Sequence, residues 1–560
     1  MQAMTATQRL MDLDAMARDG VDVLVIGGGI TGAGIALDAA TRGYRVGLVE
    51  KDDFASGTSS WSTKLVHGGI RYLPQGDVPL VHEALIERGR LLRNAPHLVH
   101  PLEFVLPLYH SSRHPVGLPI APPGGMGLGV IIDIGLGMYD LLAGAQNVER
   151  HYRLSRDEVL QRARCLRPDG LTQGFSYADG QTDDTRLVLA VMRSAVAVGA
   201  QVANYAAVVG LEAGPDGYLR AAHIRLTGPQ DGARELTIPA KHIINATGVF
   251  AEHVESLTGE TPQLNIEPSK GVHLVVRRAA LAIGEDAIVL PETADGRIIF
   301  LVPWRSRVII GTTDTGSGDL DHPRADVADV DYLLDHVNRS VVRPLARSEI
   351  ISTYAGYRPL LRLRHTRTPA RLSRTHAIVE GPSGLISISG GKLTTYRIMA
   401  QEVVDRIDAR TGKHNTCATA DWPLAGAVGW ADGAVALQER ATALGLSAAT
   451  ITHLGISYGM LAHEVLDCIV ADPTLATPLD PDLPAMLAEV EYAAQAELAL
   501  TVTDVLERRL RLGMEADGHG VAAAPLVADR LARLHGWDAA TRDAQIAAYS
   551  AYAQLHDGGL

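Results

Sequence analysis

Residues 22–50 read DVLVIGGGITGAGIALDAATRGYRVGLVE. The apolar run at residues 23–26 predicts a short buried strand, and the small residues that follow the glycines predict a helix. Residues 46–49 predict a second strand, which ends at the acidic side chain of Glu50. Strand, glycine turn, helix, strand and acid in this order are typical of a βαβ unit that binds a dinucleotide.

Each glycine of the turn has a physical task. Gly27, Gly29 and Gly32 stand in GxGxxG spacing. The first two let the backbone turn tightly and approach a pyrophosphate, the third lets the helix pack against the strand, and the helix N-terminus offers free N–H groups to the anion. Glu50 comes 18 residues after Gly32, close to the roughly 20 at which an acid meets the ribose hydroxyl. The stretch therefore predicts a dinucleotide site, for a nicotinamide or a flavin cofactor.

The composition is that of a globular protein with several domains. A chain of 560 residues is too long for one hydrophobic core, so we expect two or three domains. Hydrophobic residues make up 46% of the chain and charged residues 21%, an ordinary balance for a soluble protein. The formal net charge of -13 argues against sequence-independent binding of nucleic acid, which needs a basic surface.

The cysteines and the N-terminus indicate a compartment. Cys165, Cys417 and Cys468 are far apart, and their spacing indicates neither a disulfide framework nor a zinc site, so no metal is expected. They are typical of buried thiols in a reducing compartment. The N-terminus contains no basic stretch followed by an apolar run, so we expect no secretory signal. These features predict a cytoplasmic protein, or one on the cytoplasmic face of a membrane.

One apolar segment bears on the membrane. Residues 116–138 read VGLPIAPPGGMGLGVIIDIGLGM and carry a single charge, Asp133. The segment is long enough in principle to cross a bilayer, but its prolines and glycines would leave backbone groups unsatisfied in lipid, so we expect no crossing. Two interpretations stay open: a buried loop and helix, or a surface segment that enters the headgroup layer beside basic side chains such as Arg113.

Two later turns repeat the strand and glycine pattern. Residues 241–246 (KHIINA) predict a buried strand that leads into Ala-Thr-Gly at Gly248. Residues 385–389 predict another strand, after which Gly390 and Gly391 are expected to open a helix. A flavin site is commonly built from distant pieces, with a second helix N-terminus facing the isoalloxazine ring, whose reduced form is negative. The pattern therefore favours FAD over a nicotinamide, although a plain helix start remains the alternative for Gly390 and Gly391.

Other segments predict a second sheet and a helical end. Residues 297–303 and 306–311 predict a hairpin with its turn at Trp304 and Arg305, which implies a mixed or antiparallel sheet. Residues 412–560 are rich in alanine and leucine with helical periodicity, and we expect a separate helical domain there.

Five runs of sequence, in order along the chain, resemble one flavoprotein family. They are GTSSWSTKLVHGGIRYL (57–73), PSKGVHLVV (268–276), FLVPWRSRVIIGTTDT (300–315), TYAGYRPL (353–360) and SGGKLTTYR (389–397). The runs are similar to those of the FAD-dependent glycerol-3-phosphate dehydrogenases, within the wider group of glycine-oxidase and D-amino-acid-oxidase folds. Residues 491–514 resemble part of the helical domain that this family appends.

The resemblance implies an architecture. The fold expected is α/β, mixed α+β overall. Residues 1–411 would form an FAD-binding, Rossmann-like domain interleaved with an antiparallel-sheet substrate domain, the latter roughly at residues 72–175 and 258–350. Residues 412–560 would form the helical C-terminal domain.

The resemblance also implies a reaction, the oxidation of sn-glycerol 3-phosphate to dihydroxyacetone phosphate. A hydride moves from C2 to flavin N5 while the C2 hydroxyl loses its proton, so the site needs a base, a cation near the developing alkoxide and cations for the phosphate. His273 resembles the family's base, with a core histidine as the alternative. Arg358 resembles the arginine placed over the hydroxyl and the flavin.

The resemblance places a phosphate clamp on four distant residues, Arg71, Tyr72, Arg374 and Lys392. Three of them are basic, and a substrate dianion would be a reason to gather them, whereas an amino-acid oxidase needs one arginine for a carboxylate. For each, a solvated surface charge or structural ion pair is the alternative, and Lys392 could serve the cofactor instead. The expected cofactor contacts are Gly27, Gly29, Gly32, Glu50, Thr58, Ser59, Lys64, Gly248, Gly390 and Gly391, and His67 could pack beneath the ring.

The electron acceptor is less determined, because quinone-reducing dehydrogenases and oxygen-reducing oxidases share these motifs. We favour a membrane quinone because of residues 116–138 and because an insertion found in some oxidases is not recognised. Residues 507–514 (ERRLRLGM) or the Arg-rich helix at residues 81–94 could supply a basic docking patch, although a solvated helix face is the alternative. Peripheral membrane association and a homodimer are expected. An amine or amino-acid oxidase, or a non-catalytic flavoprotein scaffold, are the alternatives from other classes.

Overall fold

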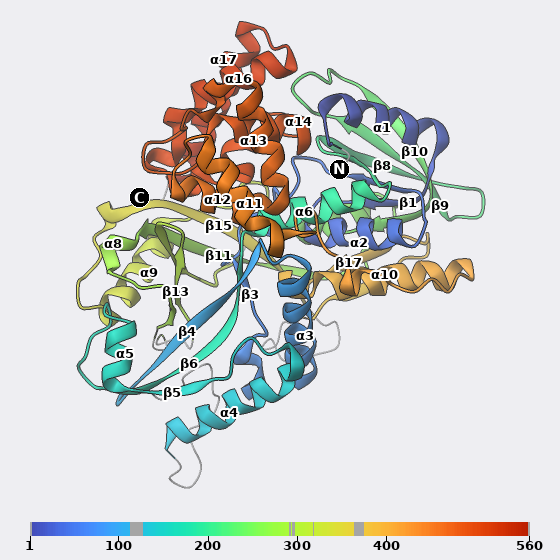
Figure 1. Ribbon diagram of the computed structural model, residues 1–560. Coiled ribbons are helices and arrows are strands. Elements are labelled where there is room, and N and C mark those ends of the chain that lie inside the picture. Colours follow the sequence, from blue (N-terminus) through green and yellow to red (C-terminus); the bar gives the residue numbers. More distant parts are fainter. Residues whose placement is uncertain are drawn as a thin grey trace.

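The structure is a computed structural model that describes residues 3–112, 127–290, 293, 297–316, 318–362 and 375–557. Figure 1 shows three parts: a sheet that carries the N-terminus, a second sheet, and a group of helices formed by the end of the chain. Arg374 and the first part of the apolar segment, up to residue 126, lie outside the described residues. The predictions on them stay predictions.

The first sheet is built around the predicted βαβ unit. Its main path runs β16-β17-β10-β1-β2-β7, with β9 pairing to β10 and β8 to β9. The strands are β1 (Val21–Ile26), β2 (Val46–Val49), β7 (Gln201–Ala203), β8 (Ala206–Ala213), β9 (Leu219–Leu226), β10 (Glu235–Asn245), β16 (Ala377–Glu380) and β17 (Ile386–Ser389). From β17 to β7 the strands are parallel.

Helices cover both faces of this sheet, which explains why β1 is apolar without a break from Val23 to Ile26. Val23 and Val25 of β1 share a core with α2 (Ile30–Thr41), α6 (Asp184–Ala197) and α10 (Tyr396–Thr411). Leu24, between them, packs instead with residues of α1 (Ala6–Asp19). Successive side chains of a strand point to opposite faces, so a strand buried on both sides reads as a continuous apolar run.

Strand β10 is longer than predicted because it pairs with two different strands along its length. The prediction began at residue 241, whereas the strand begins at Glu235. Residues 235–239 pair with β9 in antiparallel fashion, and from Ala240 onward the same strand pairs in parallel with β1. Its first part is only half-buried and lacks the apolar pattern of its end, so the sequence signal covers the buried end alone.

The second sheet is mixed and mainly antiparallel, as predicted. Its path is β15-β11-β14-β13-β12-β4-β6-β3, with β5 added to β6. The strands are β3 (Leu65–Val66), β4 (Val99–Tyr109), β5 (Tyr152–Ser155), β6 (Leu171–Thr182), β11 (Ile266–Arg277), β12 (Ala287–Val289), β13 (Phe300–Trp304), β14 (Arg307–Gly311) and β15 (Ile350–Leu361). They come from residues 65–182 and 266–361, whose ends differ by about 7 to 11 residues from the ranges 72–175 and 258–350 expected for the substrate domain.

The predicted hairpin is present, with its turn one residue later than expected. Trp304 pairs with Arg307, so the turn consists of Arg305 and Ser306. Arg305 has a φ of 51°, in the left-handed region that tight turns use. The first strand begins at Phe300, so the prediction from residue 297 was too long at this end.

Helices complete the second part of the molecule. α3 (Val78–Asn94) and α4 (Leu128–Ala143) pack against each other beside the sheet, and α5 (Arg156–Arg162) and α9 (Val327–Ser340) lie against other strands (Figure 1). α4 keeps Ile132, Leu136 and Tyr139 buried. One face of α4 therefore packs against the protein, and its other face is exposed.

The helical C-terminal domain is present and has a core of its own. Its helices are α11 (Trp430–Ala443), α12 (Ala448–Tyr458), α13 (Ala462–Ala471), α14 (Leu487–Ala496), α15 (Leu512–Glu515), α16 (Ala524–His535) and α17 (Ala539–His556). Leu454, Leu466 and Val490 are fully buried in this core. Figure 1 shows these helices, in orange and red, stacked over the boundary between the two sheets.

The basic run at residues 507–514 is not a docking patch, and that prediction was wrong. Arg508, Arg509 and Arg511 are 6%, 2% and 1% exposed. Arg509 donates to both carboxylate oxygens of Asp53, at 2.6 and 2.9 Å. Asp53 is more than 450 residues earlier in the chain, so no local pattern could reveal that these arginines face inward.

The Arg-rich helix α3 is likewise poorly suited to membrane docking. Arg88 is fully buried and donates to Asp179 at 2.6 Å. Arg90 is partly exposed and bound to Glu87 on the same helix. Of the arginines in this helix, Arg93 is the one whose side chain is about half exposed, at 48%. A single exposed cation makes no basic patch.

Candidate active site

The glycine turn of the βαβ unit is closely packed, so it admits no larger residues. A Cβ on Gly32 would lie 1.9 Å from the carbonyl oxygen of Gly27, and a Cβ on Gly27 would lie 2.6 Å from that of Ala246. Gly27 also has a φ of 110°, which favours glycine. The turn runs into the N-terminus of α2, where Ser59 Oγ accepts a hydrogen bond from the Ile30 N–H at 3.0 Å. Ser59 thus lies at the predicted pyrophosphate position.

Glu50 closes the other side of the turn. Its carboxylate accepts hydrogen bonds from Gly28 N–H at 2.6 Å and from Asp52 N–H at 3.0 Å. Desolvation raises the pKa of Glu50 to about 7, against the lowering effect of these two bonds. An acid that is partly protonated near neutrality and held at the tip of β2 is suited to share hydrogen bonds with a ribose hydroxyl.

Gly248 and Gly390 meet where β10 and β17 end side by side. Gly248, Gly390 and Gly391 all have positive φ angles, of 58°, 84° and 76°. Ser389 Oγ donates to the Gly248 carbonyl at 3.2 Å, which ties the two turns together. A Cβ on Gly391 would lie 2.4 Å from the sulfur of Met399. The two predicted turns therefore form one glycine-lined edge of the first sheet.

The helix after Gly391 starts later than expected. A 3-10 turn covers Leu393–Thr395, and the α-helix α10 begins only at Tyr396. The prediction that Gly390 and Gly391 open the helix directly was wrong, because both residues are in the left-handed region and cannot begin a right-handed helix.

Two adjoining cavities of about 170 and 240 Å³ are lined by strands of the second sheet, by residues 58–72 and by the turn that follows β17. Six residues line both, namely Thr58, Thr63, Leu65, His67, Arg358 and Lys392. The smaller cavity also contacts His273, and the larger also contacts Arg71, Tyr72 and Gly391. Segments that are far apart in sequence thus supply one continuous site with two ends.

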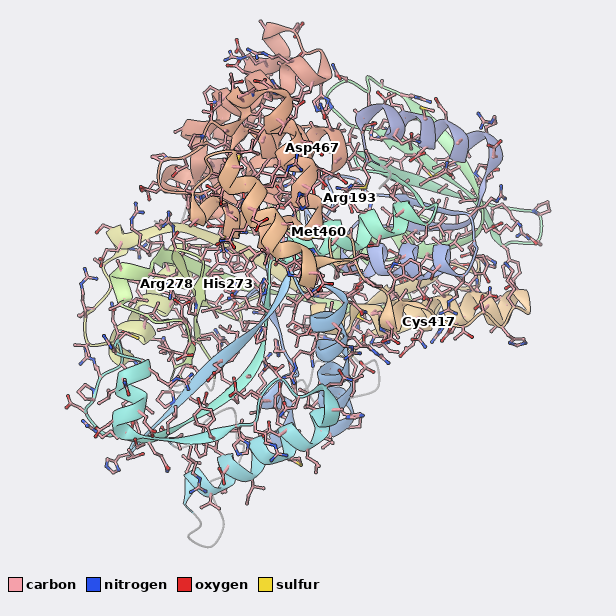
Figure 2. The ribbon with its side chains drawn as sticks, in the orientation of Figure 1. Arg193, His273, Arg278, Cys417, Met460 and Asp467 are labelled. Carbon is pink, nitrogen blue, oxygen red and sulfur yellow. The ribbon has the colours of Figure 1, made fainter. Side chains whose placement is uncertain are left out.

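His273 lies on β11, in the second sheet below the C-terminal helices (Figure 2). Its Nε2 is 2.9 Å from the hydroxyl of Thr63, and its ring stacks on Tyr354 with a centroid distance of 4.6 Å. Burial, and then the positive charges of Arg358 and Lys64, hold the pKa of His273 well below its usual range. The imidazole is therefore neutral at physiological pH and free to accept a proton.

Arg358 is on β15, opposite Ser269 of the neighbouring strand β11, and lines the same cavity as His273. Its guanidinium donates to Thr312 Oγ1 at 3.0 Å and to the Thr313 carbonyl at 3.3 Å. A Cβ on Gly271 would come within 2.5 Å of this guanidinium, so the glycine makes room for it. Burial lowers the pKa of Arg358, but an arginine stays charged, so the cavity holds a desolvated cation.

Lys392 is the least satisfied cation of the site. Its Nζ is buried and has no hydrogen-bond partner among the described residues; it lies 4.3 Å from the ring centroid of Tyr72. Burial, and then Arg71, lower the pKa of Lys392 to about 8. Arg71 itself donates to Tyr72 Oη at 3.0 Å. Three members of the predicted phosphate clamp are thus together, while Arg374 lies outside the described residues.

The remaining predicted residues divide between the cavity and the core. Thr58 lines both cavities and donates to the Tyr357 carbonyl at 2.7 Å. His67 lines both as well, and burial followed by Lys392 lowers its pKa to about 3. Lys64 does not line either cavity: its Nζ is fully buried and donates to Asp184 and to the Ser60 carbonyl, both at 2.6 Å. These contacts favour a structural role for Lys64 over contact with a pyrophosphate.

Several residues of the site had not been singled out from the sequence. Thr63 directly precedes Lys64 within the quoted run at residues 57–73, so its place in that motif was a usable signal. Asp179 on β6 and Tyr354 on β15 carry no such signal, because strand pairing brings them to the site. No group of three or more His, Cys, Asp or Glu side chains suited to a metal occurs among the described residues.

Comparison with known proteins covers nearly the whole chain. The family described as FAD dependent oxidoreductase matches residues 22–397, and the family described as C-terminal domain of alpha-glycerophosphate oxidase matches residues 417–542. A glycerol-3-phosphate dehydrogenase of Mycobacterium leprae is 38% identical, covering 98% of this chain and 91% of that protein. The mitochondrial glycerol-3-phosphate dehydrogenase of Homo sapiens is 36% identical, covering 92% of this chain and 71% of that protein.

Solved structures agree with this. The X-ray structure of the glycerol-3-phosphate dehydrogenase from Bacillus halodurans complexed with FAD has a TM-score of 0.81 and 29% identity, and the match covers 99% of both chains. A glycine oxidase from Geobacillus kaustophilus shares the fold alone, with a TM-score of 0.50 and 21% identity over 72% of this chain and 98% of that one.

Proposed function

The chain belongs to the family of FAD-dependent glycerol-3-phosphate dehydrogenases, and we propose that it oxidises sn-glycerol 3-phosphate to dihydroxyacetone phosphate with FAD as its cofactor. The observation that carries the proposal is the buried ammonium of Lys392. It has no hydrogen-bond partner among the described residues and lies in one site with Arg71 and Arg358. A desolvated cation without a counter-charge is costly, and an anionic ligand would remove that cost.

The residues of the first sheet fit FAD. The close-packed turn at Gly27, Gly29 and Gly32 would hold the pyrophosphate, with Ser59 at the helix N-terminus. Glu50 would bind the ribose, and the glycines at 248, 390 and 391 would let the backbone approach the ring end. When bound, FAD supplies a ring that accepts a hydride.

The protein's own side chains would manage the proton and the charges. His273, neutral because of its lowered pKa, would accept the proton of the C2 hydroxyl. Arg358, fixed by Thr312 and Thr313, would stabilise the alkoxide that develops on that oxygen. Both groups line the smaller cavity, so they can act on the same bound molecule.

The number of cations favours a phosphate over a carboxylate. A charge-assisted hydrogen bond contributes about 1.5–3 kcal/mol, so three of them exceed the roughly 4 kcal/mol that corresponds to millimolar binding. The surplus would offset the costs of association and ordering. A glycine or D-amino acid substrate would need one such cation and would offer no anion to the remaining cations of the site.

We propose a membrane quinone as electron acceptor and the cytoplasmic face of a membrane as location. Support comes from α4, which exposes an apolar stripe of Val130, Ile134, Met138 and Leu141, with Leu141 79% exposed. Two described segments, Leu128–Gln146 and Ala448–Ala471, are long and apolar enough to span a bilayer by length and composition only. For the first, which contains α4, one face packs on the protein, so we propose that it lies along the membrane surface.

Anaerobic mixing of the flavin-loaded protein with glycerol 3-phosphate tests the proposal. The absorbance of oxidised flavin near its visible maximum is expected to disappear within seconds. Oxygen and a ubiquinone or menaquinone analogue are then added separately, and quinone is expected to restore the absorbance faster.

Two outcomes would contradict different parts of the proposal. Bleaching by glycine or a D-amino acid, without bleaching by glycerol 3-phosphate, would replace the substrate. Fast reoxidation by oxygen and slow reoxidation by quinone would retain the substrate and change the acceptor.

A further inference from the structure

Among the described residues, His273 has a hydrogen-bond partner at one ring nitrogen only, and that partner is Thr63. Thr63 Oγ1 lies 2.9 Å from His273 Nε2. The other nitrogen, Nδ1, is buried and has no hydrogen-bond partner among the described residues. A neutral imidazole accepts a proton at one nitrogen only. A proton that arrives from the cavity at Nε2 must therefore pass the Thr63 hydroxyl or displace it.

Thr63 is well placed to meet the substrate. It lines both cavities, whereas His273 lines only the smaller one. A threonine hydroxyl can accept one hydrogen bond while it donates another, so it can receive a proton on one side and pass its own to the other. Thr63 therefore faces both cavities and contacts the base at Nε2.

The segment that carries Thr63 is fixed from both sides by buried groups. Asp184 accepts hydrogen bonds from the backbone N–H and hydroxyl of Ser62, at 3.0 and 2.7 Å, and from Lys64 Nζ at 2.6 Å. Arg511, from the C-terminal domain, also donates to Asp184. The residues on either side of Thr63 are thus tied to one fully buried carboxylate.

Tyr354 links this segment to the base itself. Its hydroxyl donates to the Ser62 carbonyl at 3.0 Å, and its ring stacks on His273 at an interplanar angle of 16°. Tyr354 therefore contacts both His273 and the residue that precedes Thr63. Such preorganised contacts are what a proton transfer at fixed geometry requires.

We propose that Thr63 is a catalytic residue that relays the substrate's hydroxyl proton to His273 Nε2. The inference rests on the proposed function. The C2 hydroxyl proton would move to Thr63 Oγ1 and the proton of Thr63 would move to Nε2, while bound FAD would supply the acceptor for the hydride of C2. The substrate becomes the ketone, the imidazole becomes imidazolium, and Thr63 ends with the same number of protons. Lys64 and Asp184 are positioning residues for this relay.

Burial lowers the pKa of His273 and keeps the ring neutral, and with the ring proton on Nδ1 the Nε2 atom can accept from the threonine. Arg358, on the neighbouring strand β15, lines the same cavity and would stabilise the charge on the substrate oxygen while the proton leaves. No second hydroxyl among the described residues bonds to His273.

The test compares two substitutions, Thr63→Val and Thr63→Ser, in the flavin-loaded protein. Valine keeps the shape and removes the hydroxyl, whereas serine keeps the hydroxyl. We expect Thr63→Val to slow anaerobic flavin reduction by glycerol 3-phosphate about 100-fold, the lower end of what acid-base catalysis contributes. Its substrate dissociation constant should change less than about threefold, and Thr63→Ser should restore most of the rate.

A second readout does not depend on turnover. In protein labelled with ¹⁵N-histidine, the Nε2 resonance of His273, identified by its loss in His273→Gln, should shift in Thr63→Val and stay in place in Thr63→Ser. If Thr63→Val fails to fold, Thr63→Ala provides the same comparison with a smaller side chain.

The outcomes separate the relay from the proposed function. Unchanged reduction by Thr63→Val, an unshifted Nε2 resonance, or a Thr63→Ser protein as slow as Thr63→Val would each overturn the relay. If the unmodified protein is not reduced by glycerol 3-phosphate at all, the proposed function fails first.

Discussion

Two sets of buried cations in this molecule have opposite surroundings. In the C-terminal domain, Arg508, Arg509 and Arg511 each donate to buried carboxylates of the N-terminal half or of their own turn. At the cavities, Lys392 has no hydrogen-bond partner among the described residues, and Arg358 has a carboxylate only at 3.7 Å. The first set is neutralised within the protein, and the second set is left for a ligand.

The comparison of the two sets shows how structural charges can be told from functional charges. The pKa of Arg509 is raised by the Asp53 carboxylate despite burial, whereas the pKa of Lys392 is lowered to about 8 by burial and Arg71. The value alone does not distinguish the roles, because burial and Arg511 lower the pKa of Lys64 to about 8 as well. Lys64 has Asp184 beside it, and Lys392 has no such partner. The presence of a partner therefore decides the assignment.

The largest effect on stability is expected from breaking a pair in the first set. Arg509→Met leaves Asp53 with only Arg508 and Asn204 for its buried charge. Removing one partner of a buried ion pair costs about 3–5 kcal/mol. Chemical denaturation should show a loss of this size, while Arg533→Met, at an exposed position of α16, should change little. Equal stability of the two variants would contradict the structural role.

The next largest effect is expected at His273, which is uncharged. Burial, and then Arg358 and Lys64, lower the pKa of His273, which is the base of the proposed site. His273→Gln should leave flavin bound and slow its anaerobic reduction by roughly 10²- to 10⁴-fold. Stopped-flow absorbance measures this rate, and flavin content provides the control. An unchanged reduction rate would remove His273 from the base role.

A smaller effect is expected at Lys392, and it should fall on binding rather than on stability. Lys392→Met should raise the dissociation constant for glycerol 3-phosphate about 10- to 100-fold, the loss of one charge-assisted bond. The free energy of unfolding without ligand should rise, because an unpaired buried ammonium is replaced by an apolar side chain. A loss of stability like that of Arg509→Met would mean that Lys392 has a structural partner.

The pH dependence of stability gives a finer test of the same residue. Lysine titrates near 10.4 in an unfolded chain, and Lys392 titrates at about 8 in the fold, so the unfolded chain binds more protons between these values. The contribution of Lys392 to the free energy of unfolding therefore rises with pH from about 8 to 10.4. Lys64 adds a similar slope, so the difference between the unmodified protein and Lys392→Met isolates Lys392. Parallel curves for the two proteins would contradict the lowered pKa.

The smallest effect is expected at the surface of α4. Ile134→Ser removes an apolar side chain that is 61% exposed, and it should weaken binding to vesicles with anionic lipid by at most about tenfold. Val435→Ser, at a similarly exposed apolar position of α11, is the matched control and should have no effect. Equal binding by all three proteins in a sedimentation assay would leave α4 without a membrane role.

Local features could be predicted from the sequence, whereas features that depend on contacts between distant residues could not. The turn at residues 27–32 and strand β2 were predicted correctly, because spacing and apolar runs are local signals. The burial of the arginines at residues 508–511 was not predicted, because their carboxylate partners include Asp53 and Asp184 from the other end of the chain. The start of α10 was missed because two glycines in left-handed conformation delay it.

The candidate site shows the same limit. Motif resemblance named Lys392, Arg71 and His273, and the fold brings them to adjoining cavities. Thr63 was within a quoted motif but was not singled out, since its value depends on a hydrogen bond to a residue 210 positions later. Tyr354 and Asp184 act through packing that no motif describes.

We propose that the cations without a hydrogen-bonded carboxylate select a phosphate dianion, and a comparison of two substrates decides whether they do. The anaerobic second-order rate constant of flavin reduction is determined for glycerol 3-phosphate and for glycerol under identical conditions. Three charge-assisted contacts of about 1.5 kcal/mol each predict a rate constant at least about 10³-fold larger for the phosphate ester. Equal rate constants for the two compounds would contradict the claim.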